Sequence, residues 1–257
     1  MEFLRYRLSA SVCLLICWIH PALGVAGDDI GLGRGATPQF VNHSFETPLV
    51  PGNGVWWSSP TEFPGWNVLT DIATTFNLHG SIWASQDENQ HIEFDNSGAT
   101  LEQTLTGFDV GTEYAVVFGL TGNPDRERVY RVRCDVLDSV AVVASGEFEA
   151  SSIGSTRPTI MWKDHAVEFA ATESSLTIRF TRTDTTGSGY GPDMDNVRMV
   201  RSCDADFTYD EVLDVFDVFA FLDAYAAHDP RADFTGEGIF DIFDVFGFLD
   251  TFATGCP

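Results

Sequence analysis

The chain has 257 residues and a net charge of −24, from 38 Asp and Glu against 14 Lys and Arg. So acidic a chain repels nucleic acids and anionic membranes, and it favours a cation-rich exterior or a basic partner. Its length is sufficient for one or two domains.

The first 26 residues have the pattern of a secretory signal peptide. Two arginines form a basic start, a largely apolar run covers 8–18, and small residues at 22–26 offer cleavage sites. A transmembrane anchor is the alternative, but the run is shorter than the roughly 20 residues that a span needs. We therefore expect a secreted protein, extracellular or at the cell surface, with no membrane span.

After a Gly-rich leader at 27–36, residues 37–201 have the pattern of β structure throughout. Apolar and polar residues alternate at 176–181, as in a half-buried strand. Further strands are predicted at 114–118, 132–136, 139–143, 166–169 and 197–200. Gly, Asn, Asp and Pro interrupt these segments at short intervals, which predicts an antiparallel sandwich or barrel. Cys134 alternates with valines, so we expect a buried small hydrophobe and not a nucleophile.

Aromatic residues in loops are candidates for sugar binding, because pyranose rings stack on exposed aromatic faces. Trp56, Trp57 and Tyr190 lie in Gly-rich stretches and are the candidates, with loop packing as the alternative. Trp66, Trp83 and Trp162 are assigned to the core.

Catalytic motifs do not stand out. The sequence has no Gly-x-Ser-x-Gly and no His-Glu-x-x-His. Two carboxylates suffice for a glycosidase, but any acidic chain supplies them. The histidines have no metal-ligand spacing; they are His43, His79, His91, His165 and His228. The sequence therefore favours a non-catalytic protein.

Short motifs in the β region occur in a recognisable order. They are Val-Asn-His-Ser-Phe-Glu at 41–46, Gly-Trp at 65–66 and Asp-Met-Asp-Asn-Val at 193–197. Residues 38–201 thus resemble a galactose-binding-like jelly-roll family of unnamed function from plant cell-wall and bacterial secreted proteins, with family-4-type carbohydrate-binding modules as more distant relatives. The resemblance implies a two-sheet jelly roll whose first and last strands pair. It also implies a structural calcium ion shared by Glu46 and Asp195, the alternative being two surface carboxylates near strand ends.

The last 25 residues repeat a segment that begins 27 positions earlier, with 13 of 25 positions identical between 206–230 and 233–257. Each copy places oxygen ligands at the positions of a twelve-residue calcium loop that precedes a helix. The ligands are Asp206, Thr208, Asp210, the Val212 carbonyl, Asp214 and Asp217 in the first loop, and Asp233, Thr235, Glu237, the Ile239 carbonyl, Asp241 and Asp244 in the second. Position 6 needs permissive backbone; it is Gly238 in the second loop but Glu211 in the first. We therefore predict two Ca²⁺ sites, of which the second is stronger.

A helix is predicted after each loop. Its apolar residues recur at i, i+3, i+4 and i+7; they are Val215, Val218, Phe219 and Leu222, then Ile242, Val245, Phe246 and Leu249. Mutual packing of the two helices is one interpretation, and a surface that awaits a partner is the other.

Cys203 and Cys256 lie on either side of the repeat. In an oxidising exterior they are the expected disulfide, with two independent thiols as the alternative. A unit of this size has little core, so cations and a disulfide would stabilise it.

Residues 203–257 resemble a type I dockerin, and more closely the dockerin-like tails of planctomycete-type secreted proteins that end in Gly-Cys. The resemblance implies a small all-α domain of paired half EF-hands that docks to a cohesin-like receptor when it holds calcium. The contact positions of dockerins, 10 and 11 of each loop, are Val215, Phe216, Ile242 and Phe243 here. These residues are more apolar than usual, which predicts a mainly hydrophobic contact.

The sequence thus predicts an all-β jelly-roll sandwich at 37–201 and a helical calcium-loop domain at 203–257. The predicted function is a secreted, non-catalytic carbohydrate- or matrix-binding protein anchored by its tail to a cohesin-like receptor or another cell-surface component. The alternatives are a surface structural protein without a ligand and a polysaccharide-acting enzyme.

Overall fold

A computed structural model describes the chain in part. The described residues are 37–50, 63–69, 76–80, 82–185, 187 and 189–256, with the backbone of 55–57. The signal peptide and the leader predicted within 1–36 lie outside them. None of the helices in the described chain is long and apolar enough to cross a membrane.

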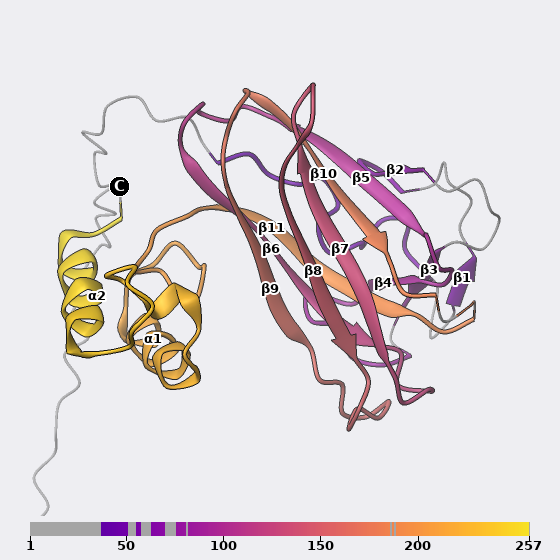
Figure 1. Cartoon of the computed structure of the whole chain (residues 1–257). Helices are drawn as coiled ribbons and strands as arrows, with labels where there is room; N and C mark the ends of the chain where they lie inside the picture. The colour runs from indigo at the N-terminus through magenta and orange to yellow at the C-terminus, as the bar shows by residue number, and fades with distance from the viewer. Residues whose placement is uncertain are drawn as a thin grey trace, which may run out of the picture. The chain divides into compact units, whose positions relative to one another are not determined.

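The described strands between residues 55 and 201 form two antiparallel sheets (Figure 1). The strands are β1 (Val55–Trp57), β2 (Asn67–Val68), β3 (Phe76–His79), β4 (His91–Phe94), β5 (Thr100–Thr106), β6 (Glu113–Gly122), β7 (Val129–Leu137), β8 (Val142–Ser151), β9 (Lys163–Ala170), β10 (Ser175–Arg182) and β11 (Pro192–Arg201). One sheet has six strands in the order β1-β3-β4-β11-β6-β9, and the other has five in the order β2-β5-β10-β7-β8. The predicted sandwich of two antiparallel sheets is therefore confirmed.

The core lies between the two sheets, because alternate residues of each strand face it. In β10 every second residue is buried, and the ring of Phe180 meets that of Phe118 from β6 with centroids 4.9 Å apart. Cys134 is a buried free thiol in this core, as predicted.

Two predictions about the strands are wrong. The segment 139–143 is mostly a turn, because Asp138 Oδ1 accepts hydrogen bonds of 2.8 Å from the amides of Val140 and Ala141, and β8 begins only afterwards. The first and last described strands do not pair. Strand β11 lies between β4 and β6, and the Val197 amide donates a hydrogen bond of 3.0 Å to the His43 carbonyl in the segment before the first described strand.

The C-terminal part contains two helices, α1 (Val215–Ala227) and α2 (Ile242–Thr254), with a short 3₁₀ helix at Pro230–Ala232 between them. Its small core includes Phe221 and Phe248, which occupy equivalent positions of the two copies and stack with ring centroids 4.1 Å apart. Cys203 and Cys256 form the predicted disulfide.

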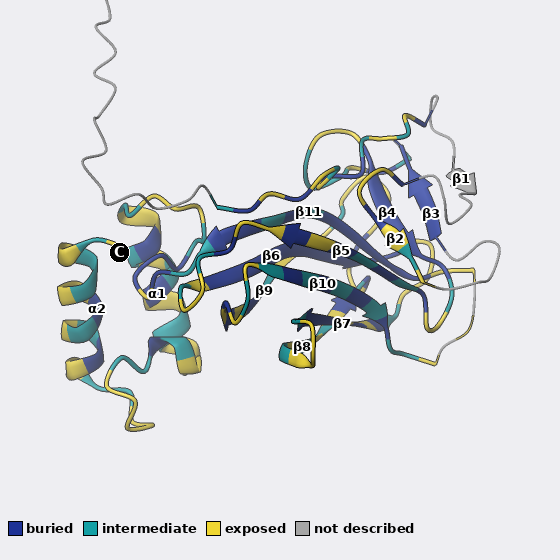
Figure 2. Cartoon of the chain, turned by 90° about the horizontal axis from the view of Figure 1, so that it is seen from above, coloured by how far each residue is buried: buried dark blue, intermediate teal, exposed yellow. Residues whose placement is uncertain are grey.

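The predicted apolar stripe of the helices is only partly the buried face. Val218 is half-buried, but Val215, Phe219 and Leu222 are 53%, 56% and 46% exposed. The buried residues of α1 are Asp217 and Phe221, one turn apart, because Asp217 closes the preceding loop and so fixes the rotation of the helix. Figure 2 shows a buried and an exposed face on both helices.

Candidate functional site

A row of polar side chains crosses the six-stranded sheet on the face opposite the core. Strand register aligns Asn77, Glu93, Asp193 and Thr121 on β3, β4, β11 and β6. Their neighbours along each strand belong to the apolar core, so the row points away from it. Each of the four residues is nevertheless at most 4% exposed. The row is therefore a buried polar site and not a solvated face.

Two histidines continue this site. His79 and His91 are paired across β3 and β4, and their rings stack with centroids 5.1 Å apart. Trp83 lies against them, at 4.6 Å from His79 and 5.6 Å from His91. Sheet register thus brings together two histidines whose spacing in the sequence gives no metal-ligand pattern.

Glu93 is held by a complete set of hydrogen bonds. Its Oε1 accepts from Asn123 Nδ2 at 2.8 Å and from the Gly191 amide at 2.7 Å. Its Oε2 accepts from Asn77 Nδ2 at 3.1 Å and lies 2.9 Å from His79 Nε2. Burial alone would raise the pKa of Glu93, but these hydrogen bonds and the charge of His79 outweigh it and lower the pKa to about 2.

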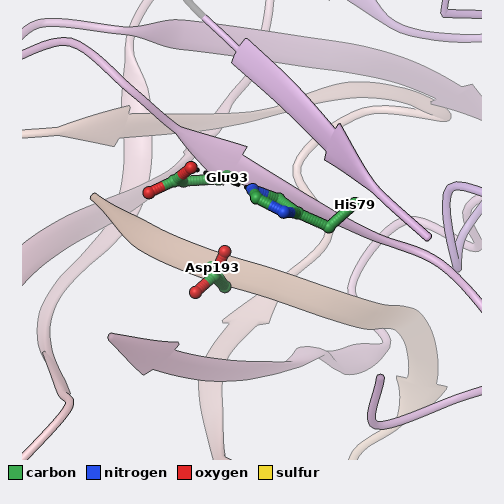
Figure 3. Close-up of side chains that lie close together, drawn as sticks. All are labelled: His79, Glu93 and Asp193. Carbon is green, nitrogen blue, oxygen red and sulfur yellow. Dashed lines mark hydrogen bonds and ion pairs between the residues drawn. The ribbon is translucent and has the colours of Figure 1, made fainter. Parts of the chain in front are cut away.

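Asp193 has no such partners. Both of its carboxylate oxygens are buried without a hydrogen bond, and the residue is 0% exposed. Burial raises the pKa of Asp193 well above its usual value, and the nearby charge of Glu93 adds to the shift. One ligand atom each of His79, Glu93 and Asp193 lie within 4.8 Å of one another (Figure 3).

His91 faces the same group. Its Nε2 lies 3.8 Å from Asp193 Oδ1 and has no hydrogen bond, whereas its Nδ1 lies 2.9 Å from Ser85 Oγ. Burial, and then the neighbouring His79, lower the pKa of His91 well below its usual value. The ring is therefore oriented by Ser85 on one side and free to bind on the other.

Glu46 and Asp195, the predicted calcium pair of the sandwich, fasten one loop. Glu46 Oε1 accepts from the amides of Asn89 and Gln90 at 2.8 and 2.6 Å. Asp195 Oδ2 accepts from the amides of residues 86 and 87 at 2.8 and 2.9 Å, and a β-bulge after Asp195 sets its direction. Burial raises the pKa of Asp195 to about 8. Both carboxylates thus hold backbone amides of the loop at 86–90.

Among the aromatic candidates, Tyr190 is 39% exposed. The Arg126 guanidinium lies 5.6 Å above its ring. Beside it, Arg157 makes two hydrogen bonds to Asp125, of 2.7 and 2.5 Å. The side chains of Trp56 and Trp57 lie outside the described residues. Trp66 lies in the sandwich core as predicted, whereas Trp83 is buried outside that core against His79 and His91, and Trp162 is only partly buried.

The two C-terminal loops have the same internal bonds at position 12. In the first loop, Asp217 Oδ1 accepts from the Thr208 amide and hydroxyl at 3.1 and 3.0 Å. In the second, Asp244 Oδ1 accepts from the Thr235 amide and hydroxyl at 3.0 and 2.9 Å.

Positions 1 and 9 complete the pattern. Asp206 and Asp233 accept from the amide at position 6, at 2.9 and 2.7 Å. Asp214 and Asp241 each cap the following helix and form a capping box with position 12. Both loops therefore have the same internal geometry, with position 9 at the N-cap and position 12 in the first turn of the helix.

The copies differ in their glycines. Positions 4 and 6 have positive φ in both loops: 56° and 63° at Tyr209 and Glu211, and 69° and 76° at Gly236 and Gly238. A side chain in this conformation costs about 1–2 kcal/mol per residue. The first loop is therefore strained where the second is not.

The predicted contact residues are all exposed. Val215, Phe216, Ile242 and Phe243 have exposed fractions of 53%, 62%, 54% and 60%. Together with Phe219, Leu222, Phe246 and Leu249 they form what we call the apolar helix faces.

Fold and site together define a two-sheet antiparallel β-sandwich protein with a buried polar site and a small disulfide-linked helical part. The chain belongs to the family described as protein of unknown function, DUF642, whose model matches residues 39–200. The match confirms the predicted membership of a family of unnamed function for the sandwich, and residues 203–257 lie outside it. No curated protein matches the chain.

Solved structures similar to this chain include binding modules and enzymes. A cyclase from Fischerella sp. TAU in complex with 4-(1H-indol-3-yl)butan-2-one is 19% identical over 65% of this chain and 98% of its own, with a TM-score of 0.48. The module TmCBM61 in complex with beta-1,4-galactotriose is 18% identical over 65% and 100%, with a TM-score of 0.46. The Clostridium thermocellum xylanase 10B modules CBM22-1 and GH10, complexed with xylohexaose, are 16% identical over 65% and 29%, with a TM-score of 0.39. Similarity at this level carries no argument about ligand or reaction.

Proposed function

We propose that this is a secreted, non-catalytic protein that binds a glycan through its sandwich and is held at a cell surface by a calcium-dependent docking tail. The observation that carries the proposal is the pair of apolar helix faces, exposed at equivalent positions of two calcium-type loop–helix repeats. Contiguous apolar surface of this kind marks an interaction site.

Calcium would be held by the oxygens at positions 1, 3, 5, 7, 9 and 12 of each loop. The hydrogen bonds from Thr208 to Asp217 and from Thr235 to Asp244 support this assignment, because they bring positions 3 and 12 to 3.0 and 2.9 Å. When bound, the ion supplies charge that holds the loop carboxylates together. The second loop is the stronger site, since glycine relieves it of backbone strain. A structural ion at Glu46 and Asp195 is a third, weaker part of the proposal.

The docking partner would be a cohesin-like receptor or another cell-surface component with an apolar contact surface. The apolar helix faces contain four phenylalanines that are 53–62% exposed, which suits a mainly hydrophobic contact. The acidic loops next to them favour a basic rim on the partner.

The test of docking uses the full chain and washed cell envelopes of the source organism. We expect binding in calcium, and loss of binding in EDTA and in the double variant F216S/F243S. V140S is the matched control, because Val140 is 88% exposed and lies in the β7–β8 turn. Binding that persists in EDTA or in F216S/F243S would overturn the docking proposal.

Glycan binding is supported by Tyr190, whose exposed ring lies beside Arg126 and the Arg157–Asp125 pair. An aromatic face with planar charged groups next to it offers stacking and hydrogen bonds to a sugar ring. On a glycan array, we expect one class of glycan to bind the wild type and V140S but not Y190A. No glycan bound by the wild type would remove the sugar claim and favour the structural alternative.

The enzyme alternative has one observation in its favour. Glu93 and Asp193 have pKa values shifted in opposite directions, which is the pattern of an acid–base pair. Their exposed fractions of 2% and 0% argue against it, because a polysaccharide has no path to them. Turnover of a polysaccharide that E93Q abolishes would reverse this conclusion.

A further inference from the structure

We propose that the buried site on the six-stranded sheet binds a first-row divalent metal ion, with His79, Glu93 and Asp193 as ligands and His91 as the fourth. Its ligands are distinct from the residues of the C-terminal loops, and the site borders the Tyr190 surface, because the Arg157 guanidinium lies 5.8 Å above the ring of Trp83. The ion proposed for this site is zinc.

The distances fit a compact coordination shell. Zinc binds imidazole nitrogen and carboxylate oxygen at about 2.0–2.2 Å, so its tetrahedral ligands lie roughly 3.4 Å apart. His79 Nε2 and Glu93 Oε2 are 2.9 Å apart, and His91 Nε2 and Asp193 Oδ1 are 3.8 Å apart. These two distances bracket the required spacing. One ligand atom each of His79, Glu93 and Asp193 lie within 4.8 Å of one another, a group that does not include His91, so the ligands must draw together around the ion.

The unpartnered atoms point to a ligand. Among the described residues, both oxygens of Asp193 and the Nε2 of His91 are buried without a hydrogen bond. Buried polar atoms are nearly always satisfied, so a group that satisfies all three belongs between them. A cation accounts for them together, because carboxylate oxygens and imidazole nitrogen are all electron-pair donors.

The surroundings hold the ligands in place. Asn123 and the Gly191 amide fix Glu93, and Ser85 fixes the ring of His91. Such second contacts orient metal ligands. Charge also favours a divalent cation, since it would neutralise two carboxylates that are at most 3% exposed.

The donor set selects the kind of metal. Imidazole suits zinc, copper, iron and nickel, whereas calcium and magnesium take oxygen ligands alone. Two histidines with two carboxylates therefore favour zinc over calcium. An excess of calcium will occupy the C-terminal loops without filling this site.

The experiment is a calorimetric titration of the untagged full chain with zinc, carried out in excess calcium. Because the ligands are buried and zinc has to reach them in the folded protein, two samples are compared. One is the purified protein after chelation, and the other is protein that was refolded in the presence of ZnCl₂. We expect the wild type to take up one more zinc ion than D193N. The control D223N, an acid-to-amide change at an exposed position of α1, should bind like the wild type. H91Q should weaken binding at least tenfold.

Thermal unfolding gives an independent readout. At a hundredfold excess over Kd, zinc should raise the Tm of the wild type by about 5–10 °C and leave that of D193N unchanged. If D193N does not fold, the comparison with D193N is replaced by the visible absorption spectrum of the cobalt-substituted wild type. Absorption bands typical of tetrahedral cobalt would support the site. Equal zinc uptake by the wild type and D193N, or a wild type without cobalt bands, would overturn the proposal and leave ordered water as the occupant.

Discussion

The glycine at position 6 of the second loop allows a sharp test of the calcium tail. Gly238 has φ 76°, and a Cβ added to it would meet no atom within 4 Å. The substitution G238A therefore introduces backbone strain without a steric clash. The equivalent residue of the first loop, Glu211, already has a side chain in this conformation.

The expected magnitude follows from that strain. A side chain in the left-handed region costs about 1–2 kcal/mol, because Cβ approaches the following carbonyl. If calcium binds the loop in this conformation, the same free energy is lost from binding. One to two kcal/mol corresponds to a 5- to 30-fold change in an equilibrium constant. We therefore expect G238A to weaken the stronger of two calcium sites about 5- to 30-fold and to make the two sites similar.

Calcium titration of the full chain by calorimetry measures both dissociation constants. G98A is the matched control, because Gly98 has φ 80°, has equally open surroundings and lies in a turn of the sandwich. G98A should lower the stability of the sandwich and leave both calcium constants unchanged. The reasoning is refuted if G238A binds calcium like the wild type, or if G98A weakens calcium binding as much.

The remaining predictions concern the tail and the sandwich. D244A should loosen residues 203–257 more than D217A, because it removes position 12 of the stronger site; amide exchange in calcium measures this, and equal effects would contradict the asymmetry. C256S should destabilise the tail by about 4 kcal/mol, because the disulfide joins residues 53 positions apart. Urea unfolding of C256S with and without calcium should then show that the stability of the tail depends on the ion. Burial lowers the pKa of His165 from 6.5 to about 4, so the folded state binds fewer protons than the unfolded state and loses stability as pH falls from about 6.5 to 4. H165Q should remove about 1–2 kcal/mol of that loss, allowing for solvent screening; equal pH profiles of stability for the wild type and H165Q would contradict it.

The loops and the disulfide could be predicted because their signals are local. A ligand ladder with fixed spacing, repeated 27 residues later, needs no knowledge of the sheet. The same ligand spacing also indicates which face of each helix is buried. Position 9 is the N-cap and position 12 the third helical residue, so the buried face of each helix begins at Asp217 and Asp244 and continues one turn on at Phe221 and Phe248. Apolar periodicity could not identify this face, because nearly every side of the helices is apolar.

The site on the six-stranded sheet could not be found from spacing. His79 and Glu93 meet through the register of β3 and β4, and Asp193 joins them through β11, about 100 positions later in the chain. Each strand alternates polar and apolar residues, as a strand with one solvated face does. These polar residues are buried because other residues pack over that face of the sheet, and Trp83 is one of them. A tryptophan assigned to the core thus lies on the opposite side of the sheet.

The acidic residues of this chain fall into two groups that should respond differently to metal removal. The carboxylates at positions 1 and 12 of the loops accept hydrogen bonds from their own backbone, so we expect each loop to keep most of its shape when the proposed calcium ion is removed. Asp193 accepts none, so its place in the sheet requires either a proton or a bound cation. EDTA should therefore release the docking contact while most of the loop geometry stays. Removal of a first-row metal should instead change the sheet itself, and the two effects can be separated because only the first is reversed by calcium alone.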